Sequence, residues 1–110
     1  MTAPISAHHR ELLEQLGAAL WTALESGREA ADRHDPIGVA DCLRAAWMVE
    51  ALRRDVQAGV GDDHVTMVLR GFARFASDRA WRDTEAVRTT LEQLPATWRS
   101  IRERRETEDP

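Results

Sequence analysis

Apolar residues recur at intervals of three and four along most of this chain, which is the period of one face of an α-helix. The first such stretch follows Ser6, a residue type favoured at helix N-caps, and its predicted buried face comprises Leu12, Leu13, Leu16, Leu20, Ala23 and Leu24. Gly27 continues the same spacing instead of ending it. We therefore predict one helix to about Arg33, in which Gly27 allows a neighbouring helix to approach closely.

A second helix is predicted to begin at Asp35-Pro36, because Asp caps helices and Pro fits the first helical position, where no N–H is needed. It should end near Ala58, before Gly59, a residue suited to the left-handed position after a helix. Its apolar residues form two stripes: Val39, Leu43, Trp47 and Ala51 on one side, and Cys42, Ala45, Met48, Val49, Leu52 and Val56 on the other. A helix this apolar is either central in its bundle or shared with a partner.

Two assignments follow from these stripes. Leu43 and Trp47 are predicted to anchor the core. The residues predicted to contact a partner are Trp21, Met48, Leu52 and Trp81, since tryptophan is enriched in interface cores and both of these tryptophans lie off the main stripes of their helices. Ordinary packing inside a single chain is the alternative interpretation of the same residues.

The rest of the chain predicts a third and a fourth helix. Asp62 and Asp63 offer an N-cap and first-turn negative charge, and the third helix buries Val65, Val68, Leu69, Phe72 and Ala76. A break is expected near Asp83, and a fourth helix should follow it with Val87, Leu91 and Leu94 facing inward. Pro95 is expected to interrupt this helix, and a short last segment carries Trp98 and Ile101 on one side. Residues 1–6 and 103–110 are expected to fray.

Strand patterns and hairpin turns are missing from the sequence, whereas Ala, Leu, Glu and Arg, which favour helices, are abundant. The predicted fold class is therefore all-α: a small up-down bundle of about four helices with a short charged C-terminal segment, forming a single domain over residues 1–110. A composition of 43% hydrophobic and 31% charged residues supports a globular chain over a disordered one.

Composition and charge narrow the classes of function. No apolar run approaches the roughly 20 residues of a membrane helix, and Met1 to Arg10 lack the apolar segment of a signal peptide, so we expect a cytoplasmic protein with no membrane partner. Cys42, the only cysteine, is expected to be buried and reduced. All fifteen basic residues are arginine, and a GC-rich bacterial genome explains this preference over lysine. The net charge of -4 gives the protein no general attraction to nucleic acid.

Two acidic pairs offer a candidate for catalysis. Glu11-x-x-Glu14 followed by Glu29-x-x-Asp32 resembles the paired acidic motifs of all-α nucleotide pyrophosphatases of the MazG type. The resemblance implies carboxylates on adjacent antiparallel helices that hold Mg²⁺, which bridges the phosphates and helps to activate water. One continuous helix through Gly27 would instead separate Glu11 from Glu29 by about 27 Å, too far for the two pairs to share an ion.

Two further groups of residues could bind ligands. In an up-down bundle the start of the first helix lies at the same end as the turn between the second and third, so the sequence leaves open a metal site formed by His8, His9, Asp62, Asp63 and His64. Arginines of the third and fourth helices could face a nucleic-acid backbone, namely Arg70, Arg74 and Arg88. Helix capping and a solvated surface are the alternative roles of these two groups.

The function predicted from the sequence is a non-enzymatic helical module for protein–protein interaction, either a homodimer or a small subunit of a larger bacterial assembly. No catalytic residue, metal ligand or cofactor is assigned. Mg²⁺-dependent nucleotide hydrolysis and binding of a nucleic-acid backbone through an arginine face stay as the alternative functions.

Overall fold

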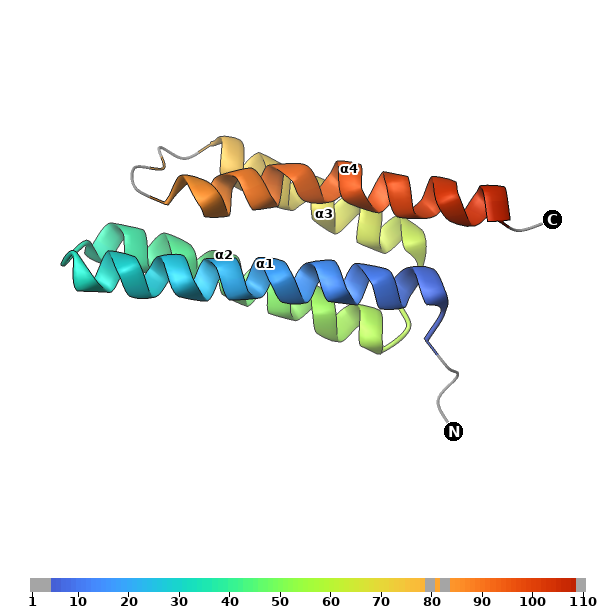
Figure 1. Cartoon of the computed structure of the whole chain (residues 1–110), viewed down its shortest axis with the longest axis horizontal. Coiled ribbons are helices and arrows are strands. Elements are labelled where there is room, and N and C mark those ends of the chain that lie inside the picture. The colour runs from blue at the N-terminus through green and yellow to red at the C-terminus, as the bar shows by residue number, and fades with distance from the viewer. Residues whose placement is uncertain (1–4, 79–80, 82–83, 109–110) are drawn as a thin grey trace.

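A computed structural model describes residues 5–78, 81 and 84–108. Within these ranges the chain forms no strand and four helices, α1 (Ala7–Asp32), α2 (Pro36–Gln57), α3 (Asp62–Ser77) and α4 (Glu85–Glu108). Successive helices run in opposite directions (Figure 1). α1 packs along α2 and α4, α3 packs along α4, and α2 meets α3 over a short stretch only. The predicted all-α, up-down bundle is confirmed.

The ends of α1 and α2 use the residues that the sequence predicted. The Ser6 hydroxyl accepts a hydrogen bond from the backbone N–H of His9 at 3.4 Å and begins α1. The Asp35 carboxylate accepts one from the backbone N–H of Gly38 at 3.0 Å and begins α2. Just beyond the end of α2, Gly59 has a φ of 93°, the left-handed conformation in which glycine carries no steric cost. The start of α1 and both ends of α2 therefore follow from local capping chemistry.

The start of α3 differs from the prediction. Its N-cap is Gly61, which has no side chain to cap the helix, and both Asp62 and Asp63 lie in the first turn. Carboxylates in a first turn still stabilise the positive end of the helix dipole. Because it does not cap α3, the Asp62 side chain is available to contact histidines of α1.

α1 and α2 approach each other closely where both helices carry small residues. A Cβ atom at Gly27 would lie 3.2 Å from the Cβ atom of Cys42, and one at Gly38 would lie 3.1 Å from that of Ala30. Larger side chains at these four positions would hold the helices apart. The predicted role of Gly27, to let a neighbouring helix approach, is confirmed.

The core is built from one stripe of each helix, and in α2 it is not the stripe that the sequence analysis chose. The buried residues of α2 include Cys42, Ala45, Val49, Leu52 and Val56. Leu43 is 56% exposed and Trp47 is 73% exposed, so the prediction that they anchor the core is wrong. The physical reason is the close approach of α1 to α2, which accepts the small side chains of the stripe that contains Cys42 and Ala45 and has no room for an indole.

α4 also differs from the prediction, because it continues through Pro95 as far as Glu108. A proline inside a helix removes one hydrogen bond and costs about 3 kcal/mol. Apolar side chains on both sides of it, Leu91, Leu94, Trp98 and Ile101, are all buried and hold the helix against the core. The break predicted near Asp83 lies outside the described residues. No helix in the described ranges has both the length and the apolar character required to span a membrane.

Candidate functional site

The four residues predicted to contact a partner fall into different environments. Trp21 is 66% exposed, as an interface residue should be, and Met48 is half-buried against the core. Leu52 and Trp81 are buried, and the indole N–H of Trp81 donates to the Ala76 carbonyl at 2.8 Å. Leu52 and Trp81 are therefore core residues of the folded chain, which corrects their assignment as contact residues.

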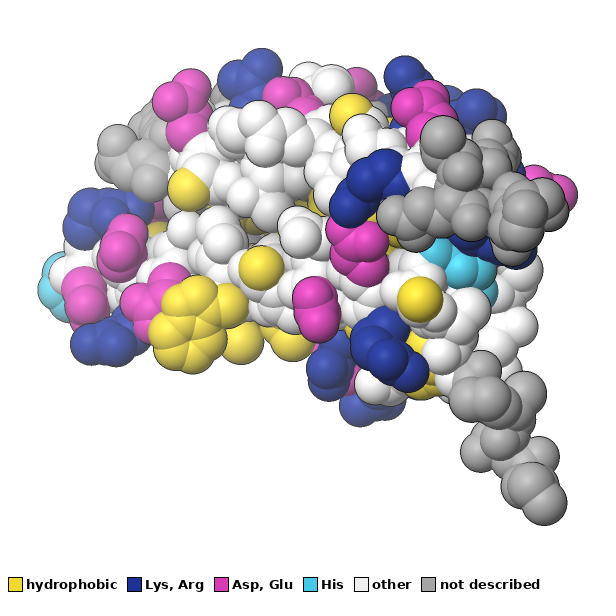
Figure 2. Space-filling view, turned by 45° about the vertical axis from the view of Figure 1, so that its right-hand side comes forward, with side chains coloured by type: hydrophobic (Ala, Val, Ile, Leu, Met, Phe, Trp, Pro, Cys, Tyr) yellow, Lys and Arg dark blue, Asp and Glu magenta, His cyan; other side chains and the backbone are white. Residues whose placement is uncertain are grey.

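An exposed apolar surface nevertheless exists, on the pair of helices α1 and α2. We call it the α1–α2 face and define it by Leu13, Gly17, Leu20, Trp21 and Leu24 of α1 and by Val39, Leu43 and Trp47 of α2. Its most exposed members are Trp47, Trp21, Leu43 and Leu24, the last of which is 46% exposed although the sequence predicted it to be buried. Figure 2 shows hydrophobic side chains gathered at the left part of the lower side of the molecule, where Figure 1 places α1 and α2.

The antiparallel register brings the two exposed tryptophans to the same level of the helix pair. Ala30 and Gly38 lie in contact near the turn. Trp21 lies nine residues before Ala30 on α1, and Trp47 lies nine residues after Gly38 on α2. Because the helices are antiparallel, both tryptophans are the same distance from the turn. The sequence alone does not show this relation, because it depends on which residues of α1 and α2 face each other.

The α1–α2 face continues into a shallow apolar hollow at the turn between the helices. The hollow has a volume of about 530 Å³ and is lined by Ala31, His34, Asp35, Pro36, Val39, Ala40 and Leu43. Val39 and Leu43 belong to both the hollow and the face. The exposed apolar surface therefore runs from the middle of the helix pair to its end.

A second candidate site lies at the opposite end of the bundle. The Asp62 Oδ1 atom is 2.8 Å from Nε2 of His9 and 3.3 Å from Nε2 of His8, and one possible ligand atom from each of the three residues lies within 4.8 Å of those of the other two. The ring of His8 stacks on Trp98 with 5.8 Å between the ring centroids. We call this group the His8–His9–Asp62 cluster.

Two of the five residues predicted to meet at this end lie outside the cluster. Asp63 is exposed. His64 instead lies 3.4 Å from a carboxylate oxygen of Asp55 on α2. The sequence identified the correct end of the bundle, and the structure selects three of the five residues.

Arginines of α4 surround the other carboxylate oxygen of Asp62. Oδ2 lies 3.4 Å from Nη1 of Arg105 and 3.8 Å from Nε of Arg102. Burial lowers the pKa of His8, more than its hydrogen bond to Asp62 raises it. Burial alone would raise the pKa of Asp62, but the hydrogen bonds from His9 and His8 outweigh it and hold that pKa below its ordinary value. Asp62 is therefore a carboxylate at neutral pH.

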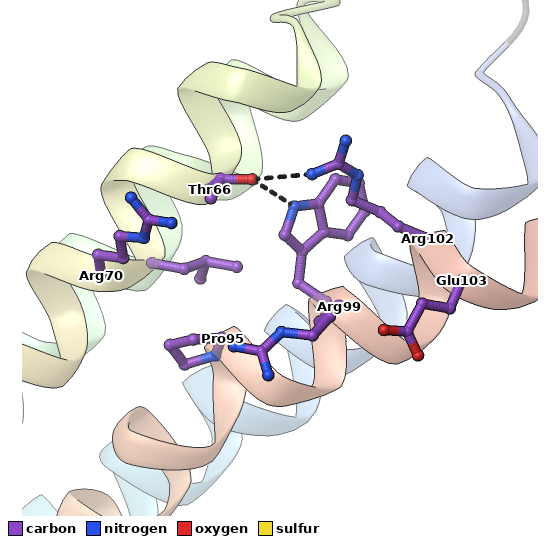
Figure 3. A pocket seen from close by; sticks show the side chains of 8 residues that line it. Thr66, Arg70, Pro95, Arg99, Arg102 and Glu103 are labelled. Carbon is purple, nitrogen blue, oxygen red and sulfur yellow. Dashed lines mark hydrogen bonds between the residues drawn. The ribbon is translucent and has the colours of Figure 1, made fainter. Parts of the chain in front are cut away.

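The arginines predicted to face nucleic acid have unequal surroundings. Arg88 pairs with Glu92 at 3.1 Å, and Arg74 is exposed on α3. Arg70 borders a cleft of about 310 Å³ between α3 and α4, lined by Thr66, Leu69, Arg70, Pro95, Trp98, Arg99, Arg102 and Glu103 (Figure 3). Sequence analysis missed Arg99 and Arg102, which approach Arg70 only through the packing of α3 on α4.

The acidic pairs of α1 stay far apart within the chain. Because α1 is unbroken from Ala7 to Asp32, Glu11 and Glu29 lie about 27 Å apart along its axis. Glu11 forms an ion pair with Arg104 of α4 instead. One chain therefore cannot bring these pairs around a shared magnesium ion.

Cys42 is buried, as predicted. Burial, with a further contribution from the carboxylates of Asp41 and Asp35, raises the pKa of its thiol to about 11. A thiol in this state is a poor nucleophile.

In comparisons with protein-family models, with curated protein sequences and with solved structures, the chain matches none of them.

Proposed function

We propose that this protein is a helical interaction module that forms a homodimer through the α1–α2 face. The observation that carries the proposal is the exposure of Trp21 and Trp47 at one level of the helix pair, with Leu24 and Leu43 beside them. Burying one large apolar side chain from water contributes about 1.5–3 kcal/mol. Monomers rarely leave a contiguous apolar patch of this kind in water unless it binds something.

The dimensions of the face favour a second copy of the chain as its partner. α1 has 26 residues and is about 39 Å long, and two helices packed about 8–10 Å apart present a face about 18 Å wide. An interface that covers the whole outer side of the helix pair, meaning the α1–α2 face together with its polar margins, would bury about 700 Å² of each chain, close to the roughly 800 Å² per partner of a standard stable interface. A second α1–α2 pair has the same length and shape, and two such pairs would pack as a four-helix bundle.

Twofold symmetry would concentrate the tryptophans at the centre of this interface. In a symmetric dimer the same patch is used by both chains, and an axis passing near Trp21 and Trp47 brings four indoles together. Large aromatic residues at the centre of an interface contribute most of the binding free energy. Gly17 adds a place for a partner side chain, since a Cβ atom there would have nothing within 4 Å.

Size-exclusion chromatography with light scattering, over a range of protein concentrations, tests the proposal. The wild-type chain should be a dimer, and Trp47→Glu should shift it to a monomer with unchanged far-ultraviolet circular dichroism. Met67→Glu is the matched control, because Met67 is 64% exposed on α3 and lies outside the face; this variant should stay dimeric. A wild-type chain that is monomeric at every concentration, or equal dissociation by both variants, would contradict the proposal.

A further inference from the structure

We infer that His8, His9 and Asp62 form a binding site for one Zn²⁺ ion. The three donor atoms are the Nε2 atoms of both histidines and Oδ1 of Asp62, and they converge from α1 and α3 although the residues lie 53 and 54 positions apart. Zinc binds imidazole nitrogen and carboxylate oxygen at about 2.0–2.2 Å in tetrahedral geometry, which places neighbouring donor atoms about 3.3 Å apart. The Nε2 atom of His8 lies 3.3 Å from Oδ1 of Asp62, and the Nε2 atom of His9 lies 2.8 Å from the same oxygen.

The Nε2 atom of His8 lies between a hydrogen-bond donor and a hydrogen-bond acceptor. This atom lies 3.1 Å from Nη1 of Arg105 and 3.3 Å from Oδ1 of Asp62. A guanidinium only donates and a carboxylate only accepts, so one ring nitrogen cannot satisfy both neighbours. A cation between His8 and Asp62 resolves this conflict, because Nε2 and Oδ1 can then both donate lone pairs to it.

The arginines of α4 complete the site by holding the other oxygen of Asp62. Arg105 and Arg102 both face Oδ2, which leaves Oδ1 directed at the histidines. Hydrogen bonds such as the one from Arg105 orient the ligands of metal sites, and the ion pair with Arg102 acts on the same oxygen. Arg102 is itself positioned by Thr66, 3.5 Å away, and by the ring of Trp98, whose centroid lies 5.9 Å from the guanidinium carbon. Binding of the ion would require Arg105 to leave Nε2 of His8, while its contact with Oδ2 can stay.

The donor set selects zinc over the harder cations. Two imidazoles and one carboxylate suit Zn²⁺, whereas Mg²⁺ and Ca²⁺ prefer sites made wholly of oxygen. Three protein ligands leave a fourth position for water. Because the ligands join the start of α1 to the start of α3, the ion would also stabilise the bundle.

Calorimetric titration of the untagged, metal-free full chain with Zn²⁺ tests the inference. One equivalent should bind to the wild type, and His9→Gln and Asp62→Asn should each weaken that binding by about tenfold or more. His64→Gln is the control, because His64 pairs with Asp55 outside the cluster, and it should bind as the wild type does. Absence of saturable binding by the wild type, or unchanged binding by His9→Gln and Asp62→Asn, would overturn the site.

A second measurement keeps the test decisive if a variant fails to fold. Circular dichroism identifies such a variant, and the wild-type chain is then titrated with Co²⁺, whose visible absorption is strong in tetrahedral sites and weak in octahedral ones. An intense band that saturates at one equivalent and is abolished by Zn²⁺ supports the site. A weak octahedral spectrum overturns it. Neither result depends on whether the chain is a monomer or a dimer.

Discussion

Gly27 of α1 faces Cys42 of α2 so closely that a Cβ atom at Gly27 would lie 3.2 Å from the Cβ atom of Cys42. This contact sets the distance between the two helices and explains which stripe of α2 is buried. Small residues at the crossing exclude the indole of Trp47, which is left in solvent. The same relationship therefore accounts for both the core of the helix pair and the exposed apolar face.

Enlarging Gly27 should force these helices apart. We expect Gly27→Val to lower the free energy of unfolding by about 1–3 kcal/mol, because overpacking a close contact shifts backbone and side chains. Gly71→Ala is the control: a Cβ atom there would meet nothing within 4 Å, so better helix propensity should raise stability by about 0.5–1 kcal/mol. Urea denaturation of both variants measures the two effects. Equal stability changes of the same sign would show that the α1–α2 contact is not tight.

The two stripes of α2 should differ sharply in their contribution to the stability of the single chain. Leu52 is 1% exposed, so Leu52→Ala should cost about 2–5 kcal/mol through lost burial and the cavity that it leaves. Leu43→Ala, at a mostly exposed position, should change the stability of the dilute monomer by less than about 0.5 kcal/mol. Denaturation at low protein concentration measures both losses. A larger loss for Leu43→Ala than for Leu52→Ala would show that Leu43 is a core residue.

The hydroxyl of Thr66 should contribute to stability through the indole of Trp98. Nε1 of Trp98 donates to Oγ1 of Thr66 at 3.0 Å, and Thr66→Val would leave this partly buried N–H without an acceptor. We expect a loss of about 1–2 kcal/mol in the free energy of unfolding. Thr97→Val provides the comparison, because the hydroxyl of Thr97 is exposed and donates only to the Gln93 carbonyl. Similar losses in both variants would indicate a general cost of valine in these helices.

Cys42 should make the stability of the protein depend on pH in the alkaline range. Burial raises the pKa of its thiol from 9.0 to about 11, so the unfolded chain loses this proton first as the pH rises. The contribution of Cys42 is therefore complete below pH 9 and decreases between pH 9 and 11, by about 3 kcal/mol at most. Cys42→Ala should lack this decrease. Parallel stability profiles of wild type and variant across that range would refute the prediction.

The sequence by itself determined the helices and most of their ends. Periodic apolar residues, the Asp35-Pro36 start of α2 and Gly59 beyond its end act within a few residues, so local propensity and capping are enough to predict them. The interruption predicted at Pro95 is wrong because it considered local propensity alone. Packing of the apolar residues on both sides of Pro95 outweighs the cost of a proline inside a helix.

Only the tertiary structure decided which apolar stripe of α2 is buried and which polar residues meet. Both stripes have helical spacing, and the choice between them depends on the distance to α1, which Gly27 and Cys42 set together across the helix pair. The up-down order placed His8 and Asp62 at one end of the bundle, but only the packing there selected Asp62 over Asp63 and His64 as the partner of His8. Contacts between distant segments depend on the register and separation of whole helices, and periodicity within each helix carries no information about either.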